Sequence, residues 1–354
     1  MENYQLIQTR GLQVNIHNPI NRFKKVPRPI ETLDGIGQLA ATKTNYLEVF
    51  PKNIIDRTMG PDLSLAYSIN PYQGDASACI YSYTRNSLTY WGYRSGAEFD
   101  QKILVKKNAA KLLEDTFQKS NWAPAPISIM ADSAYYQAAE RKFGITRQIL
   151  EICLKYRNPV CIVTNNALVE RDLDLLIELN NLQLVNVSMC FSSMDEQLRR
   201  LLEPHAASAN RKLKTIETLV ANNIPVNVMM TPIIPGLNSH EILSLAEKAS
   251  VRGASTFSCS IIRLNGSIGN VFMHWISKTF PNKAANVIHQ IQECHTGHLN
   301  DNRIEKKMNC EGKTTDMITE MATIAREKFF KGRSLQALNC GEFMRNKKGQ
   351  LGLF

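Results

Sequence analysis

The side chains best suited to chemistry gather most densely in one loop of this 354-residue chain, SINPYQGDASACIYSYTR at residues 68–85. The loop holds a carboxylate, a thiol, several hydroxyls and three tyrosines, directly after a short apolar run that predicts a strand. A thiolate is a soft ligand that suits iron–sulfur clusters, whereas carboxylate and hydroxyl oxygens are harder ligands that bind such clusters more weakly than thiolates do. Because Cys79 is the one thiol in the loop, three roles stay open: an inert buried thiol, a metal ligand beside oxygen ligands, or a cysteine with another use.

The remaining cysteines add no familiar metal-binding pair. The chain has eight cysteines, none in a C-x-x-C pair, and several lie in apolar strand-like runs, where a free thiol acts as a small apolar side chain. The spacing H-x4-C-H-x2-H at residues 289–298 lacks the two-plus-two ligand pairs that zinc sites use. With neither an apolar signal region at the N-terminus nor a run of about 18 apolar residues, we expect a reduced cytoplasmic protein with no membrane partner.

Strand and helix patterns alternate along the middle of the chain and predict the scaffold. Helical spacing of apolar residues occurs at 102–119, 145–156, 168–181, 209–222 and 240–250, and short apolar runs predict six strands, at 63–69, 127–131, 160–165, 184–191, 226–234 and 256–264. Alternation of this kind favours a parallel sheet with right-handed crossovers. The predicted fold class is α/β: a partial (β/α)6 TIM-like barrel with a helical C-terminal extension, and a doubly wound sheet is the alternative. In either fold, ligands bind at the C-terminal ends of the strands.

The charge is concentrated at the two ends of the chain. Of the net +10, residues 1–30 carry +4 and residues 306–354 carry +5, so the body between them is nearly neutral. We predict an N-terminal arm with loops at 1–60, the barrel at 61–265, a helical extension at 266–340 and a basic tail at 341–354. Basic ends with interleaved aromatic residues can contact phosphate, so nucleic acid is one candidate partner, and a solvated tail is the simpler alternative. The substrate and the oligomeric state stay unassigned.

Landmarks along nearly the whole chain resemble the branch of the radical S-adenosylmethionine (SAM) superfamily that is related to spore photoproduct lyase. They are INPY in the loop, LEPHAAS (202–208), TPIIPGLNSHEI (231–242), RLNGSIG (263–269), LND-x-R (299–303) and the closing GQLGLF. The resemblance implies a [4Fe–4S] cluster held by three cysteines in the pattern INPYxGC-x3-C-x2-C-Y, with SAM as the second cofactor. It also implies reductive cleavage of SAM to a 5′-deoxyadenosyl radical that abstracts hydrogen from the substrate. Because the lyase relative acts on a DNA lesion, the analogy supports the nucleic-acid hypothesis by fold alone.

The cluster motif of the family is broken in this chain. Its three positions hold Asp75, Cys79 and Ser82, which leaves one thiolate where the cluster needs three soft ligands. Other strand ends depart from the family pattern as well: Asn165 stands where the family has Lys, and His205 where it usually has Arg. At 130–140 the chain has MADSAYYQAAE where the family has approximately G-[NT]-T-D-x-Y-Q-P-x-E. The differences lie at the ends of predicted strands, which is where the chemistry of the fold is placed.

Polar side chains near other strand ends are the remaining candidates. For cofactor binding these are Tyr81, Ser188, Ser192, Asn238 and Arg263, and each of them is equally suited to a structural role. The first functional hypothesis is a cluster-deficient scaffold that is catalytically impaired or repurposed. The second is an active radical SAM enzyme with non-standard cluster ligation by Cys79 and oxygen ligands. The third is a nucleic-acid-binding module that uses the basic termini.

Overall fold

A computed structural model describes residues 44–57, 67–82, 85–86, 102–129, 136–299 and 312–345 of the chain. Several predictions lie outside these ranges. They concern residues 1–43, the predicted strand residues 63–66, the segment 130–135, most of LND-x-R and the closing GQLGLF.

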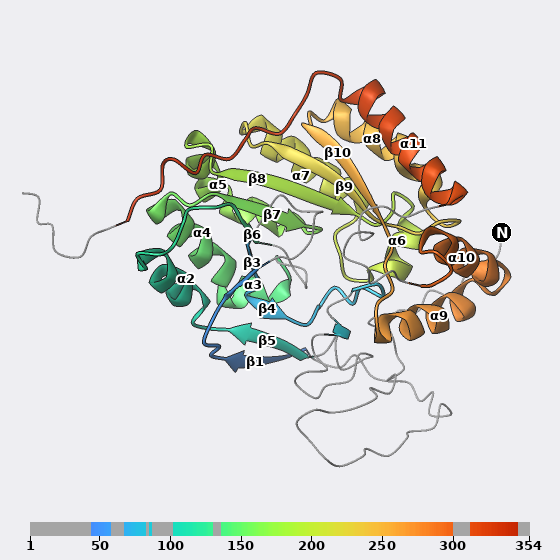
Figure 1. The fold of residues 1–354 in the computed structure, drawn as a ribbon, viewed down its shortest axis with the longest axis horizontal. Helices are drawn as coiled ribbons and strands as arrows, with labels where there is room; N and C mark the ends of the chain where they lie inside the picture. Colours follow the sequence, from blue (N-terminus) through green and yellow to red (C-terminus); the bar gives the residue numbers. More distant parts are fainter. Residues whose placement is uncertain are drawn as a thin grey trace, which may run out of the picture.

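The centre of the molecule is a sheet in which six parallel strands follow one another in chain order (Figure 1). An antiparallel strand, β2 (Ile55–Arg57), pairs with β3 and forms one edge, while β10 forms the other, so the described sheet is not closed into a barrel. This arrangement confirms the predicted partial (β/α)6 barrel in place of a doubly wound sheet, whose strand order would reverse. The parallel strands are β3 (Tyr67–Ile69), β6 (Ile127–Ile129), β7 (Val160–Thr164), β8 (Val185–Phe191), β9 (Val226–Ile233) and β10 (Thr256–Ile261).

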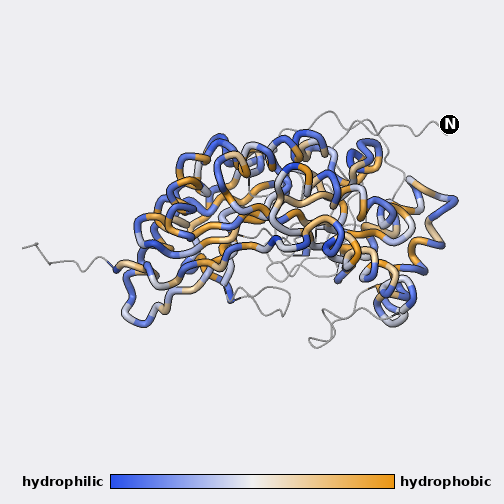
Figure 2. The backbone as a smooth tube through the Cα atoms, turned by 90° about the horizontal axis from the view of Figure 1, so that it is seen from above, coloured by the Kyte–Doolittle hydropathy of each residue, from blue (hydrophilic) through white to orange (hydrophobic). Residues whose placement is uncertain are grey.

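Helices follow the strands and cover one face of this sheet (Figure 1). They are α2 (Ala109–Gln118), α3 (Ala138–Phe143), α4 (Ile145–Tyr156), η2 (Ala167–Asp172), α5 (Leu173–Asn181), α7 (Ala209–Ala221), η3 (Ser239–Glu241) and α8 (Ile242–Val251). Helix α6 (Glu196–Leu202) lies instead beyond the strand ends, where Leu198 and Leu202 join a second apolar cluster. Figure 2 shows hydrophobic colour along the strands and the inner sides of the helices, and hydrophilic colour on the outer turns. Such one-sided helices bury their apolar stripe against the sheet.

Alternation along strand β8 shows how the sheet presents two different faces. Val185, Val187 and Met189 are fully buried and belong to the main apolar core together with Leu176 of α5 and Ile216 of α7. The alternate residues, at positions 186, 188 and 190, are half-buried. Because successive strand residues point to opposite faces, the second set lies on the face away from the helices, where polar groups can line a ligand site.

One predicted helix begins as a strand. The apolar spacing at 102–119 predicted a helix throughout, but Lys102–Lys106 forms β5, and α2 begins only at Ala109. β5 is the centre of a second, three-stranded sheet between β1 (Asn45–Val49) and β4 (Tyr72–Gln73). Ile103, Leu104 and Val105 are all buried, and a strand with apolar residues on both faces has no alternation to distinguish it from a helix.

The C-terminal region combines helices with an extended segment. α9 (Ser267–Thr279) and α10 (Pro281–Cys294) pack on one another, and α11 (Lys313–Phe329) packs on α8. Residues 330–345 then run along the edge of the sheet where the strands begin (Figure 1). At the start of this segment Phe330 stacks on Phe257, and near its end the Met344 N–H donates to the Tyr156 carbonyl at 2.9 Å. Within the described ranges, no helix has the length and apolar character needed to cross a bilayer.

The beginning of the predicted basic tail is therefore docked on the barrel. Phe343 packs edge-on against Phe117 with ring centroids 5.8 Å apart, and Arg345 donates to the Trp122 carbonyl at 3.0 Å. Arg333 donates to the Ser250 and Ala254 carbonyls at 3.0 and 3.1 Å. Phe343, Arg333 and Arg345 thus have intramolecular partners, and nucleic-acid binding by the termini stays a prediction.

Candidate functional site

The loop at 70–82 follows β3 at the C-terminal end of the sheet, and helix α3 holds it in place. The Ala76 N–H donates to Gln137 Oε1 at 3.2 Å, and Gln137 Nε2 donates to the Gly74 carbonyl at 3.4 Å. Gly74 has φ +93°, and a Cβ at this position would lie 2.4 Å from the Lys102 carbonyl oxygen. Only glycine fits this close approach to β5 without moving backbone.

A buried carboxylate anchors the start of the same loop. Glu140 is fully buried and accepts the Tyr72 hydroxyl, the Thr146 N–H at 3.0 Å and Arg171 Nη2 at 2.9 Å. Burial, and secondly the negative charge of Glu140, raise the pKa of Tyr72 well above the ordinary value of a phenol. Tyr72 is therefore a protonated donor at any physiological pH, and the loop enters the site from a fixed point.

The first two cluster positions lie in a hydrogen-bonded turn. Asp75 Oδ1 accepts both the Ser77 N–H, at 2.8 Å, and the Ser77 hydroxyl. Ser77 Oγ in turn lies 3.2 Å from Cys79 Sγ, so Ser77 links the carboxylate to the thiol. Asp75 and Cys79 are 2% and 5% exposed. The carboxylate that occupies the first cluster position is thus used to stabilise the loop.

The third cluster position, Ser82, is half-buried and lies outside this turn. Its carbonyl accepts the Arg85 N–H at 3.1 Å, and the fully buried Arg85 side chain donates from Nε and Nη2 to the Cys79 carbonyl at 3.0 and 2.7 Å. Arg85 therefore fixes the backbone between the second and third positions.

A second buried network adjoins the thiol. Tyr81 donates its hydroxyl to Glu203, whose other carboxylate oxygen lies 3.3 Å from Lys212 Nζ, and the Glu203 and Lys212 side chains are each 1% exposed. Lys212 also lies over the ring of Phe191, 5.5 Å from its centroid. Tyr81 was predicted from the sequence, whereas its charged neighbours Glu203 and Lys212 were not. The helical spacing of Lys212 with Ile216 and Leu219, which places all three on the buried face of α7, was the available signal.

Thiols in this region are held in their protonated form. Burial raises the pKa of Cys79 well above its usual range, and the negative charges of Asp75 and Glu203 raise it further. Burial likewise raises the pKa of Cys190 to about 12, although the nearby Lys212 acts in the opposite direction. Since the thiolate is the species that binds metals and attacks electrophiles, the surroundings of both cysteines oppose that chemistry.

The other predicted binding residues are placed separately from this network. Ser188 on β8 accepts Asn227 Nδ2 at 3.2 Å, and the same amide nitrogen lies 3.2 Å from Ser258 Oγ, so the three side chains form a polar row across β8, β9 and β10. Asn227 was not predicted, because it interrupts an otherwise apolar run. Arg263 follows β10 and is half-buried.

Asn238 and Ser192 come together at the ends of β8 and β9. Asn238 Oδ1 accepts the Ile234 N–H at 2.6 Å, and its Nδ2 donates to the Ser192 and Pro232 carbonyls at 2.7 and 2.9 Å. Asn238 therefore closes the loop after β9 onto the end of β8. The buried Ser192 hydroxyl has no hydrogen-bond partner among the described residues. A role of these side chains in cofactor binding stays a prediction.

The state of Cys79 can be tested by alkylation. We expect iodoacetamide to modify Cys79 of the native protein more slowly than the half-buried Cys340, since the reactive thiolate fraction falls about tenfold for each unit by which the pKa exceeds the pH. Peptide mapping by mass spectrometry measures both rates, and unfolding the protein should make them equal. Equal rates in the native state would contradict the protonated, buried thiol.

Known proteins share the fold of this chain, and part of the chain matches a family model. The fold is similar to that of a spore photoproduct lyase mutant with bound AdoMet and dinucleoside spore photoproduct, with TM-score 0.58 and 13% identity over 83% of this chain and 82% of that chain. A second structure, a spore photoproduct lyase complexed with dinucleoside spore photoproduct, gives TM-score 0.57 at 12% identity over 81% and 80%. Residues 130–249 match the family model described as the radical SAM superfamily.

Sequence relatives of this chain come from distant organisms. The uncharacterized protein Rv2578c of Mycobacterium tuberculosis is 26% identical over 221 residues, which cover 62% of this chain and 65% of that relative. The match therefore spans slightly less than two thirds of the relative's length. The uncharacterized protein MJ0683 of Methanocaldococcus jannaschii is 26% identical over 240 residues, which cover 68% of this chain and 85% of that protein.

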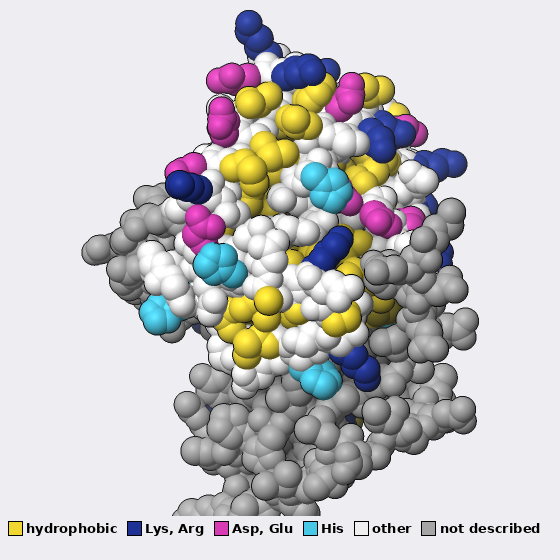
Figure 3. All heavy atoms as spheres, turned by 90° about the vertical axis from the view of Figure 1, so that its right-hand side faces the viewer, with side chains coloured by type: hydrophobic (Ala, Val, Ile, Leu, Met, Phe, Trp, Pro, Cys, Tyr) yellow, Lys and Arg dark blue, Asp and Glu magenta, His cyan; other side chains and the backbone are white. Residues whose placement is uncertain are grey.

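The described part of the chain offers no alternative metal site. Within those residues, no group of three or more His, Cys, Asp or Glu side chains is placed to hold a metal ion. In the segment 289–298, His295 is buried and its Nε2 lies 2.7 Å from the Ile262 carbonyl oxygen. Figure 3 shows the histidine side chains of the neighbouring face lying apart from one another. Asp75, Cys79 and Ser82 therefore remain the candidate metal-binding side chains in the described part of the chain.

Proposed function

We propose that this chain is a member of the spore photoproduct lyase-like branch that keeps the radical SAM scaffold but does not assemble a normal [4Fe–4S] cluster. One observation carries the proposal: the loop that should supply three thiolates supplies one, and that thiol, Cys79, is buried and linked through Ser77 to the carboxylate of Asp75. A [4Fe–4S] cluster needs soft ligands, and oxygen ligands at two of three positions do not meet that need.

The packing around the loop supports the same conclusion. A ligating thiol has to lose its proton on metal binding, and the burial of Cys79 beside two carboxylates raises the pKa against that loss. The loop carbonyl of Cys79 and the carboxylate of Asp75 both have internal partners. The chain therefore presents a hydrogen-bonded loop at the position where its relatives would hold a cofactor. Without the cluster, reductive cleavage of SAM has no electron source, so we infer an impaired or repurposed protein.

Anaerobic reconstitution with iron and sulfide tests this proposal. We expect the native chain to retain well under one iron per chain after desalting, and to lack the broad visible absorbance of a cysteine-ligated cluster. The matched control is the double variant Asp75→Cys/Ser82→Cys, which restores the C-x3-C-x2-C spacing and should retain several irons per chain under the same conditions. Iron close to four per chain in the native protein, as in a complete cluster, would overturn the proposal.

A further inference from the structure

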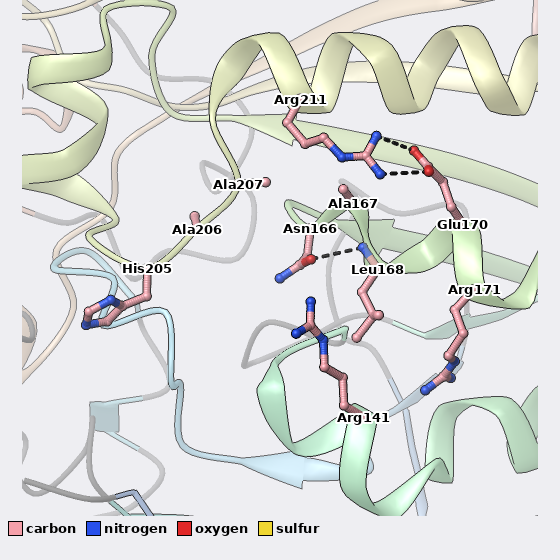
Figure 4. Close-up of a pocket in the computed structure, with 10 residues that line it drawn as sticks. All are labelled: Arg141, Asn166, Ala167, Leu168, Glu170, Arg171, His205, Ala206, Ala207 and Arg211. Atoms are coloured by element: carbon pink, nitrogen blue, oxygen red, sulfur yellow. Dashed lines mark hydrogen bonds and ion pairs between the residues drawn. The ribbon is translucent and has the colours of Figure 1, made fainter.

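A pocket of about 460 Å³ lies beside the loop described above, between α3, η2 and the start of α7. Its polar walls come from Arg141, Asn166, Glu170, Arg171, His205 and Arg211 (Figure 4). Asn166 comes just after β7, and the His205 N–H donates to the Ser77 carbonyl at 3.3 Å, so the pocket lies at the C-terminal ends of the strands. Its volume is within the range of small-molecule sites.

Two of the three arginines are fixed by carboxylates. Both terminal nitrogens of Arg211 lie 2.7 Å from the oxygens of Glu170, in a parallel two-bond pair. Arg171 donates to Glu140 and Asp172, at 2.9 and 2.6 Å from Nη2. These pairs position positive groups in the wall while leaving little net charge on them.

Arg141 differs from both. Among the described residues it has no carboxylate or carbonyl partner, and its side chain is exposed. In Figure 4 its guanidinium points across the pocket toward the amide of Asn166. An arginine is always protonated and cannot accept a hydrogen bond, so this side chain supplies an uncompensated positive charge with its donors in the pocket.

The amide of Asn166 presents a donor to the same space. Its Oδ1 accepts the Leu168 N–H at 3.0 Å and caps η2, which fixes the orientation of the amide. Nδ2 therefore faces away from the helix, toward Arg141 (Figure 4). Two groups that can only donate face one another, and an anion with several acceptor oxygens between them would satisfy both.

We propose that this pocket binds the phosphate group of a small phosphate ester, with Arg141 and the Asn166 amide as its ligands. The guanidinium fork matches the oxygens of a phosphate, and the Arg211–Glu170 ion pair forms another polar wall of the same pocket. The inference goes beyond the proposed loss of the cluster and does not depend on it, because it uses no residue of the 70–82 loop as a ligand.

Titration calorimetry of the full chain with inorganic phosphate and with glycerol 3-phosphate, at constant ionic strength, tests the site. We expect both to bind and sodium acetate to bind more weakly. Arg141→Gln should weaken phosphate binding by about tenfold or more, since a hydrogen bond to a charged group is lost. The matched control is Lys278→Gln, which removes one exposed cation from α9 and should leave affinity unchanged.

A second variant separates binding from folding. Asn166→Asp keeps the oxygen that caps η2, because aspartate is an equally good capping residue, but it replaces the amide donor with a negative charge. We expect an unchanged circular dichroism spectrum and no measurable phosphate binding. Equal affinity in the native protein, Arg141→Gln and Asn166→Asp would overturn the proposal. So would the absence of phosphate binding to the native chain, or an equal loss in Lys278→Gln.

Discussion

Replacing Lys212 with methionine is expected to lower the free energy of unfolding by about 3 to 5 kcal/mol, the cost of leaving one partner of a buried ion pair alone. The Lys212 and Glu203 side chains are each 1% exposed, and their charged atoms lie 3.3 Å apart. Methionine fills a similar volume, so the loss comes from the Glu203 carboxylate, which among the described side chains keeps only the Tyr81 hydroxyl as a partner. Urea denaturation followed by circular dichroism measures the change.

A double-mutant cycle separates the ion pair from the packing of the lysine stem. Glu203→Gln alone should also destabilise the protein, because Lys212 then loses its carboxylate, but Glu203→Gln combined with Lys212→Met should cost less than the sum of the two. We expect a coupling energy of about 2 to 3 kcal/mol, within the range for residues that share one network. The control on the same helix is Lys214→Met, an exposed lysine whose replacement should change stability by less than about 0.5 kcal/mol. An additive cycle would show that the pair contributes nothing beyond its packing.

The network of Lys212 shows what sequence patterns can and cannot predict about this site. Glu203 lies in LEPHAAS, a landmark used to recognise the family, and Tyr81 lies in the loop that was singled out first. Their contact joins residues 122 positions apart, and no local pattern specifies such a pair. A charged residue on a helix is also expected at the surface, since lysine and glutamate are rarely buried unless they are paired.

The six parallel strands, by contrast, could be predicted because their signal is local. Each is a short run of β-branched and apolar residues bounded by polar residues or proline, and strands joined by a crossover helix pair in parallel as neighbours. The predictions missed β1 and β5, which pair with one another across more than fifty residues. β5 carries buried residues on both faces, so its periodicity could not separate strand from helix.

The candidate site was predictable from the sequence in part. The loop, its position after β3 and the identity of its three cluster positions were available from the sequence, because the motif spacing is local. The use of Asp75 as an acceptor for Ser77, and the closing of the loop by Gln137, depend on side-chain geometry that the motif does not encode. Substitution of two ligands predicts the loss of the cluster, and the hydrogen bonds supply a physical account of what the loop does in its place.

Replacing Glu140 with glutamine is expected to lower the free energy of unfolding by about 3 kcal/mol, because a fully buried carboxylate with four donors becomes a neutral amide. Glutamine has one oxygen acceptor, whereas Glu140 accepts from Tyr72, two backbone N–H groups and Arg171 with both of its oxygens. The amide NH2 group would then face another donor, and Arg171 would keep only Asp172 as its carboxylate partner.

The same substitution should act on the loop, because Tyr72 joins Glu140 to the segment that leads to Asp75. Tyr72→Phe removes the hydrogen bond to Glu140, together with the 3.4 Å contact from the Ile145 N–H to the hydroxyl. It should cost about 1.5 to 3 kcal/mol, as for a bond to a charged group. The surface control is Glu151→Gln, which removes a 51% exposed carboxylate from Arg147 and should cost less than about 1 kcal/mol. If Glu140→Gln proves no more destabilising than Glu151→Gln in urea denaturation, the carboxylate does not anchor the loop. If Glu140→Gln also speeds the alkylation of Cys79 relative to Cys340, the buried carboxylate is what keeps the loop closed over its thiol.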